Sequence, residues 1–270
     1  MDNYNKNTTL NNSYPKSDSD FLDLEKIIDN YIIDKNIRPF FNQNSKFLTL
    51  GSCFAGNLHK FLLKNSFDSY HEEFTEALNN PLILNNFLIQ LKSNPAGKEA
   101  FIERIKESNV FILTVGMALA WFRLDGSLIS NPFNKKNIND YMQKTISVEM
   151  AKLCLLRVYQ SIYELNKDIK IVVTLSPVAT NRTFEYHSAI FADCLSKSIL
   201  RSAIHESLLQ VPENLKPIYF PSFEIVKWIG AHRGDAYGNT SGKAEGNPPR
   251  DVSPHYINAI IKSFIKHYQI

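Results

Sequence analysis

The sequence predicts a three-layer α/β fold built on a largely parallel sheet. Short, continuous apolar runs alternate along the chain with longer segments whose apolar residues recur every three or four positions. The short runs are typical of strands buried on both faces, and the longer segments are typical of amphipathic helices. Most of the short runs end at a glycine, a serine or a proline, as the turns between a strand and a following helix do. Strands that alternate with helices favour a parallel sheet covered on both sides.

The elements follow one another in a regular order. Residues 1–20 are polar and predict a loosely attached arm, and 21–33 carry the apolar spacing of an amphipathic helix. Strands are predicted over 47–50, 67–70, 110–115, 169–175 and 217–220. Helices are predicted from Ser52 to about 67, then over 81–91, 98–107, 138–165, 187–209 and 224–229, with a last one from Pro254. The stretches 131–139 and 230–250 are predicted to be irregular.

Four or five such strands fit a flavodoxin-like, doubly wound sheet. We expect two parts in the chain: an N-terminal arm with its lead-in helix over 1–40, and one α/β domain over 41–270. Ser52, Gly116, Ser176 and Ser222 each follow a predicted strand. We therefore expect these four residues to lie along one edge of the sheet.

The composition excludes several classes of function. The net charge of +3 is small and the basic residues are dispersed, so no nucleic-acid-binding stripe is expected. The three cysteines, at positions 53, 154 and 194, lack the spacing of a metal site and indicate reduced thiols in a cytoplasmic protein. No run has the length of a membrane span or the pattern of a secretion signal, and no nucleotide-binding glycine loop is present. We therefore expect no cofactor, no metal, no nucleic acid and no membrane span; the oligomeric state stays open.

Ser52 is the first candidate for chemistry. It is predicted at the carboxyl end of a strand and the amino end of a helix, where ligands bind in open α/β sheets. The free N–H groups and the dipole of the helix stabilise negative charge at that point. A serine at this position also serves well as an ordinary helix cap, so the position alone does not identify a nucleophile.

The residues Gly-Ser-Cys-Phe-Ala at 51–55 are identical to the motif that names the GSCFA family. That family resembles a branch of the SGNH (GDSL-type) hydrolases, in which the serine of this turn is the nucleophile. Further stretches are similar to family sequence: 114–116, 176–178, 181–184, 192–198 and 220–224. The resemblance covers about 46 to the C-terminus, and it implies an SGNH-like fold with Ser52 as nucleophile.

The resemblance also implies donors for an oxyanion. The N–H groups of Ser52 and Gly116 are candidates, and Asn80 is a third, although an Asn-Pro pair is equally suited to a helix cap. The asparagine that standard SGNH enzymes carry in their third block is absent here. Cys53 is a rival nucleophile, because the start of a helix lowers a thiol pKa; an inert thiol is the simpler interpretation.

The general base is not evident. Family members carry a histidine just before the last helix, whereas Asp251 occupies that position here, and a carboxylate of ordinary pKa is a poor base for a serine. Three alternatives stay open. His255 takes the role with Asp251 orienting it, or His232 reaches in from the long loop, or the base is missing.

The sequence thus predicts a serine ester hydrolase or O-acyltransferase that acts through Ser52 on an acylated saccharide. The saccharide comes from the resemblance, and aromatic residues expected beside the cleft would stack on sugar rings: Trp121, Phe122, Trp228 and Tyr237. The alternative is a domain that binds carbohydrate or another partner and has lost catalysis.

Overall fold

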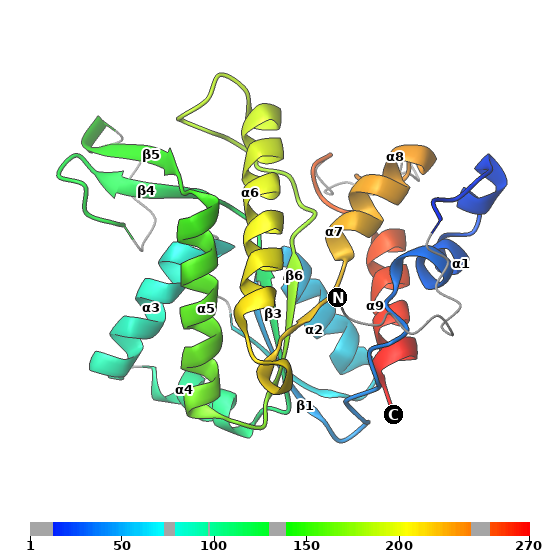
Figure 1. Cartoon of the computed structure of the whole chain (residues 1–270), viewed down its shortest axis with the longest axis horizontal. Coiled ribbons are helices and arrows are strands. Elements are labelled where there is room, and N and C mark those ends of the chain that lie inside the picture. The colour runs from blue at the N-terminus through cyan, green and yellow to red at the C-terminus, as the bar shows by residue number, and fades with distance from the viewer. Residues whose placement is uncertain (1–12, 73–78, 97, 130–138, 239–248) are drawn as a thin grey trace.

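The fold is a five-stranded parallel sheet between two layers of helices (Figure 1). The computed structural model describes residues 13–72, 79–96, 98–129, 139–238 and 249–270. In the sheet the strands stand in the order β2–β1–β3–β6–β7, and all neighbours are parallel. Their bounds are Lys46–Gly51 for β1, Asp68–Glu72 for β2, Val110–Val115 for β3, Lys170–Leu175 for β6 and Ile218–Tyr219 for β7.

This strand order is that of a flavodoxin-like doubly wound sheet, in which the second strand lies outside the first and the later strands follow on the other side. The prediction of fold class is confirmed. The central strand β3 is buried along its whole length, as its unbroken apolar sequence requires. Its register aligns Leu113 with Leu50 on one side and with Val173 on the other.

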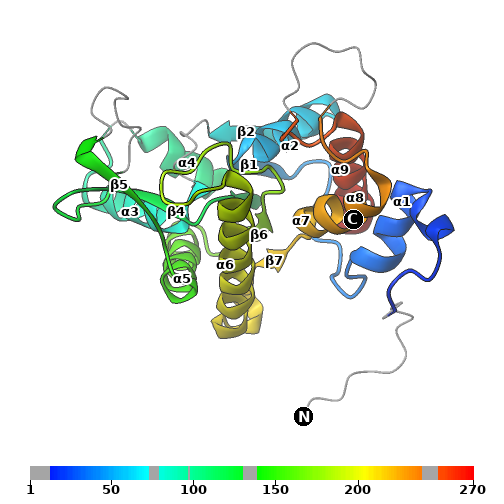
Figure 2. The same ribbon diagram turned by 90° about the horizontal axis from the view of Figure 1, so that it is seen from above.

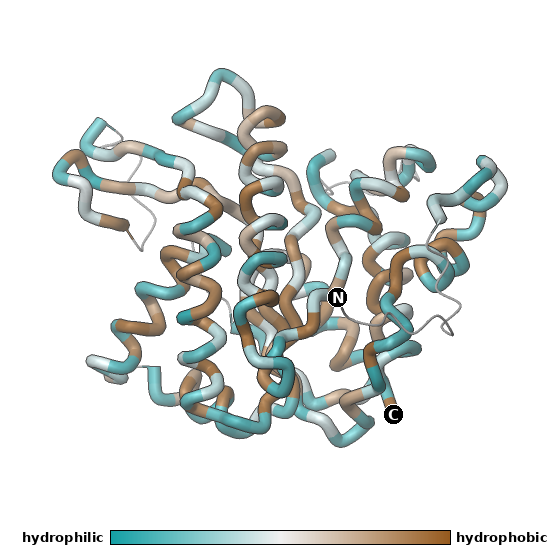
Figure 3. Tube along the Cα trace, in the orientation of Figure 1, coloured by the Kyte–Doolittle hydropathy of each residue, from teal (hydrophilic) through white to brown (hydrophobic). Residues whose placement is uncertain are grey.

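Successive residues of the strands point to opposite faces of the sheet, and each face packs against its own hydrophobic core. Leu48 and Leu50 face the layer formed by α3 (Pro81–Ser93), α4 (Glu99–Glu107), α5 (Val148–Leu165) and α6 (Ala189–Gln210). Phe47 faces the layer that includes α1 (Leu24–Ile27), α2 (Cys53–Lys64) and α9 (Pro254–Tyr268). Figure 2, seen from above, separates these two groups of helices, and Figure 3 shows the hydrophobic residues gathered on the strands and the inner helix faces.

Several short elements complete the second layer. A π-helix, η2 (Ile28–Ile32), continues α1, and the 3₁₀ turn η1 (Asp18–Phe21) precedes it. After β7 the chain forms α7 (Ser222–Glu224), a second π-helix η6 (Ile225–Ile229) and α8 (Gly230–Arg233). A further 3₁₀ turn, η5 (Glu213–Leu215), joins α6 to β7. The predicted irregular segment 230–250 therefore begins with a helical turn, and its residues 239–248 lie outside the described part of the chain.

The lead-in helix is held to the last helix by an ionic cluster. Asp29 accepts hydrogen bonds from Ser263 (3.2 Å), from His267 Nε2 (2.9 Å) and from Lys266. Burial raises the pKa of Asp29, and the hydrogen bonds from Lys266 and His267 lower it by more, so that the net shift is downward. The carboxylate thus stays ionised and joins residues more than 230 positions apart.

One predicted helix is wrong in its first part. The sequence predicts a single helix over 138–165, but Tyr141–Thr145 form strand β5, which pairs antiparallel with β4 (Leu119–Arg123). The helix α5 begins only at Val148, where the Ser147 side chain caps it by accepting the Met150 N–H at 3.1 Å. This hairpin stands apart from the main sheet (Figure 1).

No described helix combines the length and the apolar character needed to cross a membrane.

Candidate functional site

The carboxyl ends of the parallel strands gather the residues that the sequence singles out. Ser52 follows β1, Gly116 follows β3 and Ser176 follows β6, and these strands are neighbours in the sheet. Ser222 follows β7, and its hydroxyl donates to Leu175 O at 3.1 Å. The prediction that these four residues share one sheet edge is confirmed, and this edge is the place where open α/β sheets bind ligands.

Gly51 forms the turn that brings Ser52 to this edge. Its φ of +126° lies in a region that side chains rarely allow, and a Cβ there would stand 2.1 Å from Thr114 O on β3. Only glycine lets β1 reach its end in such close contact with β3. The turn therefore fixes the position of Ser52 relative to the third strand.

Ser52 is the N-cap of α2. Its backbone is extended (φ −71°, ψ 173°), and its Oγ accepts the N–H of Phe54 at 3.3 Å. The residue is 6% exposed, so the hydroxyl lies just beneath the surface. The hydroxyl proton remains available to a base, and the amino end of the helix favours an anionic oxygen at this point.

The two other predicted oxyanion donors lie at the same edge but have partners inside the protein. The Gly116 N–H donates to Asn79 O at 2.9 Å. Asn80 is fully buried and caps α3: its Oδ1 accepts the Leu82 N–H at 2.9 Å and its Nδ2 donates to Leu119 O at 3.1 Å. Asn80 thus has the structural role of a helix cap, and Gly116 would have to release Asn79 before it could bind an oxyanion.

Two buried oxygens beside this turn make no hydrogen bond with any described residue: Thr114 Oγ1 and Asn79 Oδ1. Thr114 is the residue against which Gly51 packs, and the Asn79 side chain lies next to Gly116. Buried polar atoms without partners are rare and often accompany functional sites. These two oxygens make the contact between the ends of β1 and β3 a polar site within an otherwise apolar core.

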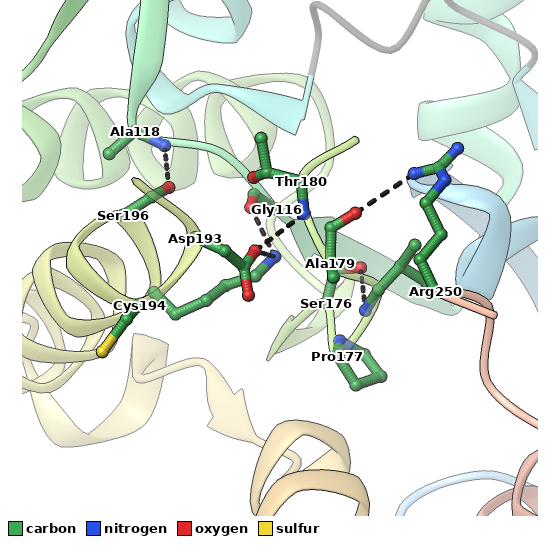
Figure 4. A network of polar contacts seen from close by, with 12 residues as sticks. Gly116, Ala118, Ser176, Pro177, Ala179, Thr180, Asp193, Cys194, Ser196 and Arg250 are labelled. Atoms are coloured by element: carbon green, nitrogen blue, oxygen red, sulfur yellow. Dashed lines mark hydrogen bonds and ion pairs between the residues drawn. The ribbon is translucent and has the colours of Figure 1, made fainter. Parts of the chain in front are cut away.

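Helix α6 anchors the two loops that follow β3 and β6 (Figure 4). Lys197, only 3% exposed, donates from Nζ to Gly116 O at 2.6 Å, and the Ser196 hydroxyl accepts the Ala118 N–H at 2.7 Å. Asp193 accepts the Thr180 N–H at 2.9 Å. These residues come from the segment 192–198 that resembles family sequence, and they act on the backbone of the strand ends.

Further contacts from the C-terminal third of the chain hold the loop after β6. Arg250 donates to Ala179 O at 3.1 Å (Figure 4), and Tyr237 donates to Pro177 O at 3.0 Å. Lys227 lies 3.7 Å from Asp193. The loop 176–180 is therefore tied to Asp193 of α6, to Tyr237 after α8 and to Arg250 before α9, and Lys227 of η6 pairs with the same Asp193.

Among the described residues, none of the predicted base residues forms a hydrogen bond with the Ser52 side chain. His255 is the second residue of α9, is exposed and forms no hydrogen bond with Asp251; its described ring contact is with Tyr256. His232 lies in α8, where its Nε2 bonds the Tyr14 hydroxyl at 2.8 Å and its ring stacks on Phe21. His232 thus belongs to the contact between α8 and the N-terminal lead-in.

Asp251 precedes α9, close to the start of α2. It lines a groove together with Phe54, two residues after Ser52, and with Val178. Its Oδ1 is buried without a hydrogen bond and stands 3.9 Å from Arg250 Nε. The structure describes the helical backbone at Cys53 and leaves its side chain outside the described part.

Sequence reasoning missed His71, which lies on the edge strand β2 beside β1. Its Nδ1 bonds the Thr49 hydroxyl at 2.9 Å, and its Nε2 stands 3.3 Å from the point where a Cβ of Gly56 would be. Ser52 precedes Gly56 by four residues, a spacing that brings side chains to about 5–6 Å of each other on one helix face. Thr49 and His71 pair between two strands, so no local sequence pattern predicts their contact.

The neighbouring residue Glu72 points to the opposite face of β2. Burial raises the pKa of Glu72, although a hydrogen bond from Tyr70 and the charge of Arg104 oppose that shift. Arg104 also lies over the Tyr70 ring at 3.3 Å. The carboxyl therefore belongs to the contact between β2 and α4, away from Ser52.

The aromatic residues expected beside the cleft are dispersed. Trp121 packs against Phe184 on the hairpin side, with ring centroids 5.2 Å apart. Trp228, 61% exposed, lines a separate cavity together with Tyr31. Tyr237 alone of these three reaches the loop after β6. Within the described residues, no group of three or more His, Cys, Asp or Glu side chains is arranged to hold a metal ion.

Comparison with models of known protein families shows the family of this chain. The model of the GSCFA family matches residues 91–239, more than half of the chain. The chain belongs to the GSCFA family. The matched part includes β3, β6 and the anchoring segment of α6, and the Gly-Ser-Cys-Phe-Ala motif stands outside it, so motif and match are separate observations.

Two solved structures are similar to this chain at a low level. One is a putative GDSL-like lipase from Parabacteroides merdae, 9% identical, with 86% of this chain and 99% of that chain covered and a TM-score of 0.45. The other is a carbohydrate esterase family 2 enzyme with a carbohydrate-binding domain from Corynascus thermopiles (Myceliophthora fergusii), also 9% identical, with 88% and 70% covered and a TM-score of 0.45. Both likenesses are too distant to bear on activity. A comparison with curated proteins found no match.

Proposed function

We propose that this GSCFA protein is a serine ester hydrolase or O-acyltransferase that acts through Ser52. The observation that carries the proposal is the position of Ser52, at the carboxyl end of β1 and as the N-cap of α2, behind a turn that only glycine permits. In the reaction Ser52 Oγ attacks the acyl carbonyl and the alcohol leaves with a proton. Water or a second hydroxyl then releases the acyl group from Ser52.

His71 is the proton acceptor that we propose for Ser52. Two features support it: the Thr49 hydroxyl orients the imidazole, and the bare backbone of Gly56 leaves room for the ring beside the first turn of α2. Ser52 and His71 form no hydrogen bond in the structure, and catalytic contacts of this kind often close only when substrate binds. His255, with Asp251, and His232 are the competing acceptors.

The test is hydrolysis of p-nitrophenyl acetate by single variants. Ser52→Ala should lower kcat/KM by about a thousandfold or more, because the nucleophile is removed. His71→Ala should lower it by about a hundredfold to ten-thousandfold, the usual contribution of a general base. His232→Ala and His255→Ala are matched controls that should stay close to wild type. Activity that survives in Ser52→Ala and disappears in Cys53→Ala would make Cys53 the nucleophile.

One set of observations favours a second candidate, a binding domain without turnover. Asp251 stands where a base is expected, and no hydrogen bond joins the Ser52 hydroxyl to any of the described histidines. A folded wild-type protein that hydrolyses no ester yet binds acylated saccharides would support this candidate. In that case Ser52→Ala would leave binding unchanged. The acylated saccharide is the proposed ligand under both candidates.

A further inference from the structure

A groove runs between α2 and α9 from the neighbourhood of Ser52 toward the far end of α2. It encloses about 470 Å³, and its apolar walls come from both helices, from the loop after β6 and from the segment before α9: Phe54, Phe61, Val178, Val252 and Ile257. Two amide side chains, Asn57 of α2 and Asn258 of α9, also line the groove. Apolar surface combined with a few amides is what sugar rings and their hydroxyls require.

The groove is positively charged at one end. Lys60 and Lys64 line it, both are exposed, and no described carboxylate forms an ion pair with either. Other lysines of the chain are paired, as Lys92 is with Glu164 and Lys106 is with Glu103. The two ammonium groups stand one helical turn apart on the same face of α2.

The only described carboxylate that lines the groove lies at its other end. Asp251 stands near Phe54, at the start of both helices, whereas the lysines follow later along α2. An α-helix rises about 1.5 Å per residue, so Lys60 lies about 9 Å and Lys64 about 15 Å along the axis from Phe54. The groove therefore separates a site beside Ser52 from a cationic site by roughly the length of two sugar residues.

We infer that the groove binds an acidic saccharide, whose carboxylate or phosphate reaches Lys60 and Lys64 while its acylated end lies beside Ser52. The inference rests on the proposed function for the placement of the acyl group, and on the groove alone for the charge of the ligand. Asn57 and Asn258 bind hydroxyls along the way, and Phe54 and Phe61 supply faces for the rings. The substrate class is thus an O-acylated acidic glycan rather than a neutral one.

The test is binding of two disaccharides without an ester, so that catalysis is not needed. Cellobiouronic acid and neutral cellobiose are titrated into the full chain and followed by calorimetry or NMR. Two exposed ion pairs contribute modestly, so the acid should bind about threefold to thirtyfold more tightly than cellobiose. In the double variant Lys60→Gln/Lys64→Gln this preference should disappear, while the affinity for cellobiose should hold.

A charge-matched control is Lys167→Gln. Lys167 is exposed in the turn between α5 and β6, at the opposite edge of the sheet, so its removal should leave the preference intact. Equal affinity of wild type for the two sugars, absence of binding by both, or an unchanged preference in the double variant would overturn the inference. Preference for the acid in a protein that hydrolyses no ester would instead contradict the proposed function and leave the acidic-glycan site standing.

Discussion

Gly51→Ala should be the most damaging single-methyl change in the chain, because two penalties combine there. The φ of +126° at Gly51 is a conformation reserved almost entirely for glycine, and such strain costs about 1–3 kcal/mol. The added Cβ would also stand 2.1 Å from Thr114 O, which belongs to the backbone of the central strand and cannot turn aside. Either β1 or β3 must shift, so we expect a total loss above about 3 kcal/mol.

Two other glycines with positive φ serve as controls that separate the cost of backbone strain from the cost of the steric clash. Gly126 (φ +85°) and Gly234 (φ +72°) have nothing within 4 Å of an added Cβ, so alanine there costs only the strain, about 1–2 kcal/mol. Urea unfolding followed by circular dichroism measures all three variants. A chain of this size loses roughly 2–4 °C of melting temperature per kcal/mol, which gives a second measurement. Equal stability of Gly51→Ala and Gly126→Ala would refute the steric account of the turn before Ser52.

Two further predictions concern charged side chains that hold elements together. Asp29→Asn should lower the free energy of unfolding by about 1–2 kcal/mol near neutral pH. The pKa of Asp29 is lower in the folded protein than in the unfolded chain. Its contribution to the free energy of unfolding is therefore present above the unfolded pKa and is lost as the pH falls through the folded pKa. In urea melts, the difference in stability between Asp29→Asn and wild type should vanish in acid. Lys197→Met should cost about 1–3 kcal/mol, because it removes the donor to the buried Gly116 O and one of the two cationic partners of the Asp193 carboxylate. Lys227→Met removes a more exposed partner of that carboxylate and should cost less than about 1 kcal/mol; equal losses in thermal melts would contradict this account.

The sheet could be predicted from the sequence because its signals are local. Each buried strand is a continuous apolar run, and the strand before Ser52 ends at the glycine that its turn requires. The helices α3 and α9 begin at prolines, as Pro81 and Pro254 indicate. Strand order then follows from the rules of parallel βα units, with little freedom left.

The hairpin could not be predicted in the same way. Met142 and Ile146 fall at helical spacing with the apolar residues of α5, so the pattern extends the helix backward. What makes 141–145 a strand is its pairing with β4, in which Met142 stands opposite Phe122. That contact joins residues 20 positions apart and overrides the local period.

In the candidate site, too, some residues could be predicted from local sequence patterns and others could not. Ser52 and Gly116 are visible because each follows a strand, and their place at one edge is a consequence of the sheet. His71 is not visible, because its relation to the first turn of α2 depends on the pairing of β2 with β1 and on the missing side chain of Gly56. The segment 192–198 is found through its resemblance to family sequence, while its task, holding Gly116 O through Lys197, follows only from the packing of α6.

If Ser52 is a nucleophile, a reagent that reacts with activated serines should modify it. The folded wild-type protein is incubated with a fluorophosphonate, which phosphonylates activated serines, and the modified peptide is identified by mass spectrometry. We expect one adduct, on the peptide that contains Ser52; it should be absent from Ser52→Ala and should form much more slowly in His71→Ala. An unmodified protein, or an adduct that persists in Ser52→Ala, would contradict this expectation.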